Sequence, residues 1–441
     1  MEGSLEEKLF YSVLQEDQDT VLQLVSQGAN PNKIACHGKT SLGVAVKTGN
    51  KNLVKILLDA CASSSTAKKP SPQSSTKKRY SKSHKRKLNS SECDETVVKC
   101  KNISDRTFKE CQIDESDSLI VNNGACLEAR DTGERTALYL AAGRGHLDVV
   151  LYLVSVGANV NGEEIHGYTP LCEAVWQRST DVVEILLASG ARVTHSHKLL
   201  HNAIIQRQEE IVTMLANLGG GINLHNDNGD TPLLLTVRLC QPAVARILLE
   251  KGANVNLCNS ITGASALHIA VESLDYPEDF QELLACLIEY KIDLNATALT
   301  GDTALNRALL LHKDFAAVLL IRHGCDVNAC DLHSCGLDNL SIASRRRSIS
   351  LASMLLKAGH YFPIPDPNNS IPKEGTTKNW LYHICKHPPS LFDICRITIR
   401  RFCKKRPLFS YVHSLPLPKS LKGLLMLEDE GNLDNIIITT S

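Results

Sequence analysis

The sequence repeats itself, and this periodicity constrains the fold more than any other feature. A glycine-led signature stands at 28–32 (Gly-Ala-Asn-Pro-Asn), 157–161 and 252–256 (Gly-Ala-Asn-Val-Asn) and 324–328 (Gly-Cys-Asp-Val-Asn). A second signature, Thr-x-Leu in its commonest form, contains a leucine that returns after about 33 residues. The leucines in this place are Leu42, Leu138, Leu171, Leu200, Leu233, Leu267, Leu305 and Leu340. Such a chain folds as a stack of small units, and the apolar faces of each unit are buried only against the neighbouring units.

Each unit has the pattern of two short helices. In residues 136–157, Thr136 is a suitable N-cap and Leu138 begins a short packing stripe. Residues 147–154 form a second, more apolar helix, which Gly157 ends because a left-handed cap suits glycine. We therefore predict an all-α fold, a solenoid of helix pairs.

The period and both signatures resemble those of ankyrin repeats. Two places depart from the period. The distance from Leu42 to Leu138 is about 63 residues too long, and the excess is first rich in Ser and Lys and then acidic. Low hydrophobicity with high charge predicts a disordered insertion. Around residues 275–279 the spacing stretches by about five residues, which predicts a longer loop between two helices.

The predicted organisation follows from these breaks and from the prolines after Gly359. Repeats are expected at 1–61 and 119–360, the insertion at 62–118, a proline-containing linker at 361–387, a small helical module at 388–427 and a tail at 428–441.

Composition excludes several classes of protein. Lys plus Arg and Asp plus Glu both total 48, so no global field attracts the chain to nucleic acid or membrane. No apolar run is long enough to span a bilayer, and the amino terminus is acidic rather than like a signal peptide. We expect an intracellular protein that contacts neither membrane nor nucleic acid.

The sequence gives no sign of an enzyme, a cofactor or a metal site. The 16 cysteines include no C-x-x-C pair and are expected to be reduced thiols. Cys325, Cys330 and Cys335 fit small packing residues better than metal ligands. The group His383, Cys385 and His387 lacks a recognisable fourth ligand, and no nucleophile–base pair is evident.

A short amphipathic helix is predicted near the carboxyl end of the chain. Ser390 is a good N-cap with Asp393 three residues later. One side of this helix carries Leu391, Ile394, Cys395, Thr398, Ile399 and Phe402, and the other carries Arg396, Arg400, Arg401 and Lys404. A helix this short is marginal alone, so its apolar stripe must meet either the rest of the module or another protein.

The motifs of this segment resemble a SOCS box. Leu391-x-x-x-Cys395-x-x-x-Ile399 resembles the elongin-binding box, and the segment Leu415, Pro416, Leu417, Pro418, x, x, Leu421 resembles the cullin-5 box. One departure is Gly423-Leu424, where the family often has an aromatic residue. With repeats before this module, the chain is similar to the ankyrin repeat and SOCS box proteins.

That resemblance implies a non-catalytic substrate receptor of a ubiquitin ligase. Leu391, Cys395 and Ile399 would contact elongin C, which is joined by elongin B. Leu415, Pro416, Leu417, Pro418 and Leu421 would contact cullin-5 with its RING subunit; cullin-2 is the alternative. The repeats would bind an unidentified target and so promote its ubiquitination and degradation.

Two alternatives stay open. The chain is an ankyrin scaffold without ligase function if its last helices only cap the repeats. A basic cluster in the insertion resembles a nuclear localisation signal, so we expect a cytoplasmic protein that is also found in the nucleus if the signal acts. The residues of this cluster are Lys77, Lys78, Arg79, Lys85, Arg86 and Lys87. A nucleic-acid binder using residues 68–87 is less well supported, because Tyr80 is the only aromatic residue there.

Overall fold

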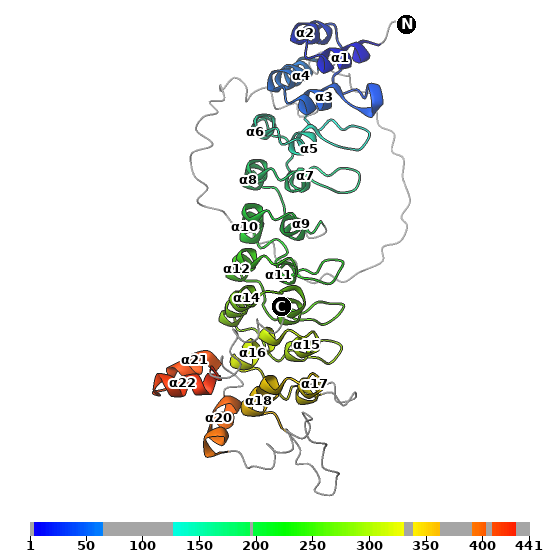
Figure 1. Cartoon of the computed structure of the whole chain (residues 1–441). Helices are drawn as coiled ribbons and strands as arrows, with labels where there is room; N and C mark the ends of the chain where they lie inside the picture. The colour runs from blue at the N-terminus through cyan, green and yellow to red at the C-terminus, as the bar shows by residue number, and fades with distance from the viewer. Residues whose placement is uncertain are drawn as a thin grey trace, which may run out of the picture. The chain divides into compact units, whose positions relative to one another are not determined.

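The computed structural model describes residues 4–64, 127–194, 197–329, 338–361, 390–402 and 408–428. Within these ranges the regular structure is helical, apart from isolated bridges such as that between Ile34 and Thr40. The chain forms two compact units, Met1–Leu199 and Leu200–Ser441. Within each unit, the first helix of a pair lies beside the turn that leads into it, and the second helix lies beside the first, on the side away from that turn (Figure 1).

The helix pairs follow the predicted repeats. The first unit contains α1 (Leu5–Leu14), α2 (Gln18–Ser26), α3 (Ser41–Thr48), α4 (Lys51–Ser64), α5 (Ala137–Ala142), α6 (Leu147–Ser155), α7 (Pro170–Trp176) and α8 (Thr180–Ala188). Helix α9 (Leu199–Ile205) begins at the division between the units. The second unit continues with α10 (Glu209–Asn217), α11 (Pro232–Arg238), α12 (Pro242–Glu250), α13 (Ala266–Ser273), α14 (Pro277–Glu289), α15 (Ala304–Leu310), α16 (Asp314–Arg322), α17 (Asn339–Arg345) and α18 (Ile349–Ala358).

The repeated leucines form the core, as the period predicts. Every one of the eight is at most 2% exposed. The threonine before the first helix caps it where expected: the Thr136 Oγ1 accepts a hydrogen bond from the Tyr139 N–H at 3.3 Å, and Thr40 does the same for Gly43 at 3.0 Å. Gly157 has a φ of 90°, the left-handed conformation predicted for the end of the second helix.

The last asparagine of the glycine-led signature joins neighbouring repeats. The Asn328 side chain donates to the Gly359 carbonyl at 3.0 Å and accepts from the Tyr361 N–H at 2.8 Å. Asn256 repeats this pair of bonds with the Lys291 carbonyl and the Asp293 N–H. The signature therefore recurs because a short side chain with both a donor and an acceptor bonds two backbone groups of the next turn.

The two departures from the period have different structural outcomes. Helix α4 continues through Ser64, so the first three residues assigned to the insertion are helical, and residues 65–126 lie outside the described part. The repeats on either side still stack, because the Thr132 N–H donates to the Gly38 carbonyl at 3.1 Å.

The longer loop predicted around residues 275–279 is wrong. Pro277 stands at the first position of α14, which has 13 residues where α12 has 9. The additional residues lengthen the second helix of this pair, because proline is favourable at the first helical position and starts the helix there.

Three helices complete the described chain: α20 (Leu391–Phe402), α21 (Leu408–Ser414) and α22 (Lys419–Met426). Leu408, Val412, Leu425 and Met426 form a small separate core between α21 and α22. Helix α20 packs beside α18, the last helix of the repeats (Figure 1).

Candidate functional site

Helix α20 begins where its sequence predicts. The Ser390 Oγ accepts a hydrogen bond from the Asp393 N–H at 3.1 Å, and the Ser390 Oγ–H donates to the Asp393 carboxylate at 2.6 Å. Burial raises the pKa of Asp393, but the hydrogen bonds from Ser390 and the charge of Arg396 outweigh burial and hold this pKa below its ordinary value. The carboxylate is therefore ionised at neutral pH and stabilises the first turn of the helix.

The predicted apolar stripe of α20 faces solvent. Leu391 is 77% exposed and Phe402 is 82% exposed. Ile394 and Cys395 between them are exposed as well. Large apolar side chains gathered on one helix side without cover are typical of a surface that another protein buries.

The arginine side of α20 packs against the repeats. Arg396 and Arg400 are only 5% and 8% exposed. The Arg396 Nε–H donates to the Lys357 carbonyl at the end of α18 at 3.0 Å, and it also pairs with Asp393. Arg400 donates to the Ile321 carbonyl at the end of α16 and to the Leu425 carbonyl at 2.9 Å. Cationic side chains at helix carboxyl ends satisfy the last carbonyls and favour the helix dipole.

Two turn glycines of the last repeats touch the carboxyl-terminal helices. A Cβ on Gly324 would lie 2.7 Å from the Cβ of Leu408, and one on Gly359 would lie 3.0 Å from a methyl of Ile397. At Gly252, the same place in an earlier repeat, such an atom would meet nothing within 4 Å. The turns at Gly324 and Gly359 therefore pack closely against α21 and α20.

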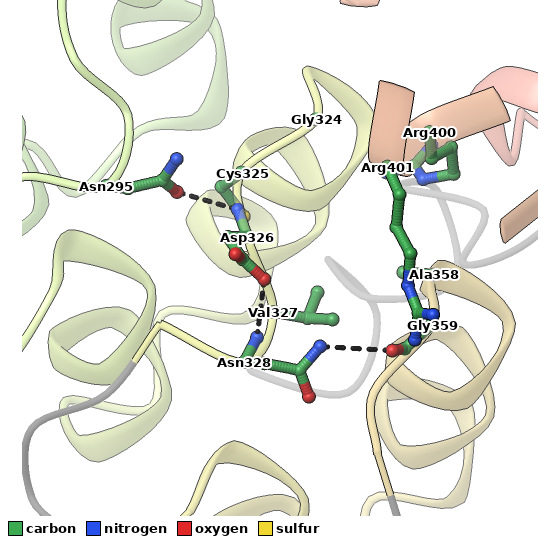
Figure 2. A pocket seen from close by; sticks show the side chains of 10 residues that line it. All are labelled: Asn295, Gly324, Cys325, Asp326, Val327, Asn328, Ala358, Gly359, Arg400 and Arg401. Atoms are coloured by element: carbon green, nitrogen blue, oxygen red, sulfur yellow. Dashed lines mark hydrogen bonds between the residues drawn. The ribbon is translucent and has the colours of Figure 1, made fainter. Parts of the chain in front are cut away.

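A polar cavity of about 260 Å³ lies at this junction. Figure 2 shows Asn295, Asp326 and Asn328 on its repeat side and Arg400 and Arg401 on its α20 side. It occupies the arginine side of the helix, so it is separate from the exposed stripe.

The structure brings part of the two predicted motifs together. Ile399 of the first motif and Leu415 and Leu417 of the second pack against the small core of α21 and α22. Pro416, Pro418 and Leu421 remain exposed. Helix α22 continues through the buried Gly423, so this glycine does not interrupt the helix.

Other predicted residues fall elsewhere. The basic cluster at 77–87 and the group His383, Cys385 and His387 lie outside the described residues, as do Cys330 and Cys335. Cys325 is buried, and burial raises the pKa of its thiol to about 12. No group of three or more potential metal-ligating His, Cys, Asp or Glu side chains occurs within the described ranges. No helix in the described part is both long and apolar enough to cross a bilayer.

The contacts that hold α20 against the repeats are not evident from the amino-acid sequence. The spacing of Arg396 and Arg400 placed both on one side of the helix, but a basic side normally faces water. Only the open carbonyls at the ends of α16 and α18 explain why these two are buried.

Comparisons with known proteins match both parts of the chain. The family model for ankyrin repeats in three copies matches residues 113–197 and 200–298, and the SOCS box model matches 387–426. All the predicted docking residues, from Leu391 to Leu421, lie inside the second match.

Curated relatives share the repeats to different extents. The nuclear factor NF-kappa-B p105 subunit of Gallus gallus is 29% identical over 40% of this chain and 19% of that protein. The B-cell lymphoma 3 protein homolog of Mus musculus is 29% identical over 44% of this chain and 43% of that protein. The chain thus spans less than half the length of these two relatives.

One relative is similar over more of the chain. Ankyrin repeat and SOCS box protein 6 of Homo sapiens is 24% identical over an alignment of 342 positions, and the match covers 58% of this chain and 81% of that protein. Together with the two model matches and the helical structure, this likeness shows that the chain carries ankyrin repeats followed by a SOCS box, the combination after which the ankyrin repeat and SOCS box family is named.

Proposed function

We propose that the chain is a non-catalytic substrate receptor of a ubiquitin ligase. Its SOCS box would bind elongin C with elongin B and recruit cullin-5 with its RING subunit, while its ankyrin repeats hold a target protein for ubiquitination and degradation. The exposed apolar stripe of α20 is the observation that carries this proposal.

The stripe supports docking because no described residue covers Leu391, Ile394, Cys395 or Phe402. Helix α20 is held to the repeats by its opposite side, through Arg396 and Arg400. Leu391, at 77% exposure, projects from the first turn and is the anchor we assign to an elongin C pocket. Burying one such leucine contributes about 1.5–3 kcal/mol to binding before costs.

The second motif divides into two roles. Leu415 and Leu417 pack inward on the α21–α22 core, whereas Pro416, Pro418 and Leu421 are exposed. We assign the cullin contact to these three exposed residues, since prolines hold a segment in one conformation and reduce the entropy lost on docking. Ile399 packs on the same core as Leu415, so it also couples the two motifs.

The test is affinity capture from cells with elongins B and C, cullin-5 and cullin-2 quantified. Leu391→Asp should remove both elongins, because it puts a charge in an apolar pocket while Asp is favourable at the first position of a helix. Leu421→Asp, in the first turn of α22, should remove cullin-5 and leave the elongins bound. Both variants keep the inward leucines and should melt like the wild type.

Leu299→Asp is the matched control, since Leu299 is 75% exposed on a repeat turn and should affect neither partner. Retention of elongins by Leu391→Asp at the wild-type level would refute the assignment of the stripe. If the wild type captures no elongin, the scaffold alternative holds; recovery of cullin-2 in place of cullin-5 would overturn the choice of cullin.

A further inference from the structure

Four basic residues lie at the two ends of α3 and α5, the first helices of the second and third repeats. Lys39 and Arg135 immediately precede the N-caps of α3 and α5, Lys47 lies in the last turn of α3, and Arg144 follows α5. These two repeats are stacked, since the Thr132 N–H donates to the Gly38 carbonyl at 3.1 Å. We call these four residues the basic surface.

The basic surface has more positive than negative charge. Arg135 is paired with the buried Asp131, at 2.8 Å between Nη2 and Oδ2. Lys39, Lys47 and Arg144 have no ion pair with any described residue. Burial lowers the pKa of Lys47, and the charges of Arg135 and Lys39 lower it further. Like charges are therefore held together at a cost in free energy.

The repeat fold does not require this surplus. In the second unit the place immediately before the N-cap, where Lys39 and Arg135 stand, holds an aspartate before Thr231 and before Thr303, and a nearby arginine pairs with it. Arg238 pairs with Asp230 at 2.8 Å, and Arg307 pairs with Asp302 at 2.8 Å and with Glu272 at 2.9 Å. The surplus of positive charge is therefore a feature of the second and third repeats, where a partner of negative charge could bind it.

We propose that the basic surface binds an acidic stretch of polypeptide in the target protein. This inference rests on the proposed function in taking the repeats as the target-binding part. Helix α3 has eight residues, so about 12 Å separates Lys39 from Lys47. An extended peptide covers that distance in about four residues. The recognised stretch of the target thus carries carboxylates about four residues apart. One carboxylate would lie near the starts of α3 and α5, and the other near their ends.

The experiment measures binding of a fluorescein-labelled peptide of alternating Glu and Ser to the full chain by anisotropy. A peptide of alternating Lys and Ser is the probe of opposite charge. The double variant Lys47→Glu with Arg144→Glu should weaken binding of the acidic probe by about tenfold or more. Lys251→Glu, at an exposed position after α12, is the matched control and should stay within about twofold of the wild type.

The acidic probe should bind more weakly as salt is raised, because the contact is electrostatic. The proposal is wrong if the acidic probe binds no better than the lysine probe, or if the double variant binds it like the wild type. Displacement of the probe by single-stranded oligothymidine at lower concentration than by unlabelled acidic peptide would also overturn it in favour of nucleic acid. Elongin capture by the same variants should be unchanged, so failure here is distinguishable from failure of the proposed ligase role.

Discussion

His268 is a buried histidine that the structure requires to be neutral. Its Nδ1 accepts a hydrogen bond from the Ser265 N–H at 3.2 Å, and since that amide is only a donor, Nδ1 carries no proton. Its Nε2–H therefore donates to the Asp302 carbonyl at 3.0 Å. Burial lowers the pKa of this imidazole, as does Arg307, against the opposing effect of Asp302 and Glu272.

A pH dependence of stability follows. The pKa of His268 is lower in the folded than in the unfolded chain, so the unfolded chain takes up its proton first as pH falls below about 6.5. The contribution of neutral His268 to the free energy of unfolding is fully present above that pH, and it is lost as pH falls toward the pKa of His268 in the folded chain. Chemical denaturation between pH 7.5 and 5 should show this decline, with a smaller slope for His268→Gln. His166→Gln, at an exposed position, should keep the wild-type slope; an equal slope in all three would contradict the assignment.

At the scale of the element, helix α20 depends on the repeats for its order. Its 12 residues are too few for a stable helix in water, and most of its apolar side is exposed, with Ile399 as the exception. Its order therefore depends on the Ser390 cap, on the packing of Ile399, and on the two arginines that bond carbonyls of α16, α18 and the α22 segment.

Removing one of those arginines should loosen the helix. Arg400→Met keeps the length of the side chain but leaves two carbonyls without their cationic donor, a loss of about 2 kcal/mol. Hydrogen exchange of the amides in α20 should accelerate accordingly. Arg401→Met changes the exposed neighbour and should leave exchange as in the wild type. Equal protection in the two variants would show that the arginine contacts do not hold α20.

At the scale of the whole molecule, residues 65–126 separate two repeats that nonetheless stack as neighbours. The His146 Nε2 lies 3.1 Å from the Lys47 carbonyl, and the His146 ring covers Gly49, where a Cβ would lie 2.9 Å from it. The contacts between these repeats are thus of the same kind as those between repeats adjacent in sequence.

Replacing residues 66–125 by a linker of about ten Gly and Ser residues should leave the thermal melt within a few degrees. Each halving of a flexible loop changes the free energy of folding by only about 0.6 kcal/mol. A melting curve followed by circular dichroism checks this, with the full chain as reference. A large loss of stability would mean that the replaced residues contribute packing to the repeats.

The sequence by itself determined the helix pairs, their leucine core and the apolar stripe of α20. These depend on period and local capping, which are properties of neighbouring residues: Thr136 caps α5 and Ser390 caps α20 as their patterns predict. The local pattern gave a wrong prediction at residues 275–279. Additional residues between two repeat helices fit either a longer loop or a longer second helix, and the structure shows that Pro277 begins a longer second helix.

Tertiary structure alone decided which side of α20 is buried. An amphipathic pattern predicts that the apolar side packs and the basic side is solvated, yet Arg396 and Arg400 are buried and Leu391 is exposed. The reason is that the ends of α16 and α18 present carbonyls, which an arginine satisfies and a leucine does not. The convergence of Ile399, Leu415 and Leu417 on one core, and the surplus charge of Lys39, Lys47 and Arg144, likewise depend on residues far apart in the chain, and no local pattern specifies their distances.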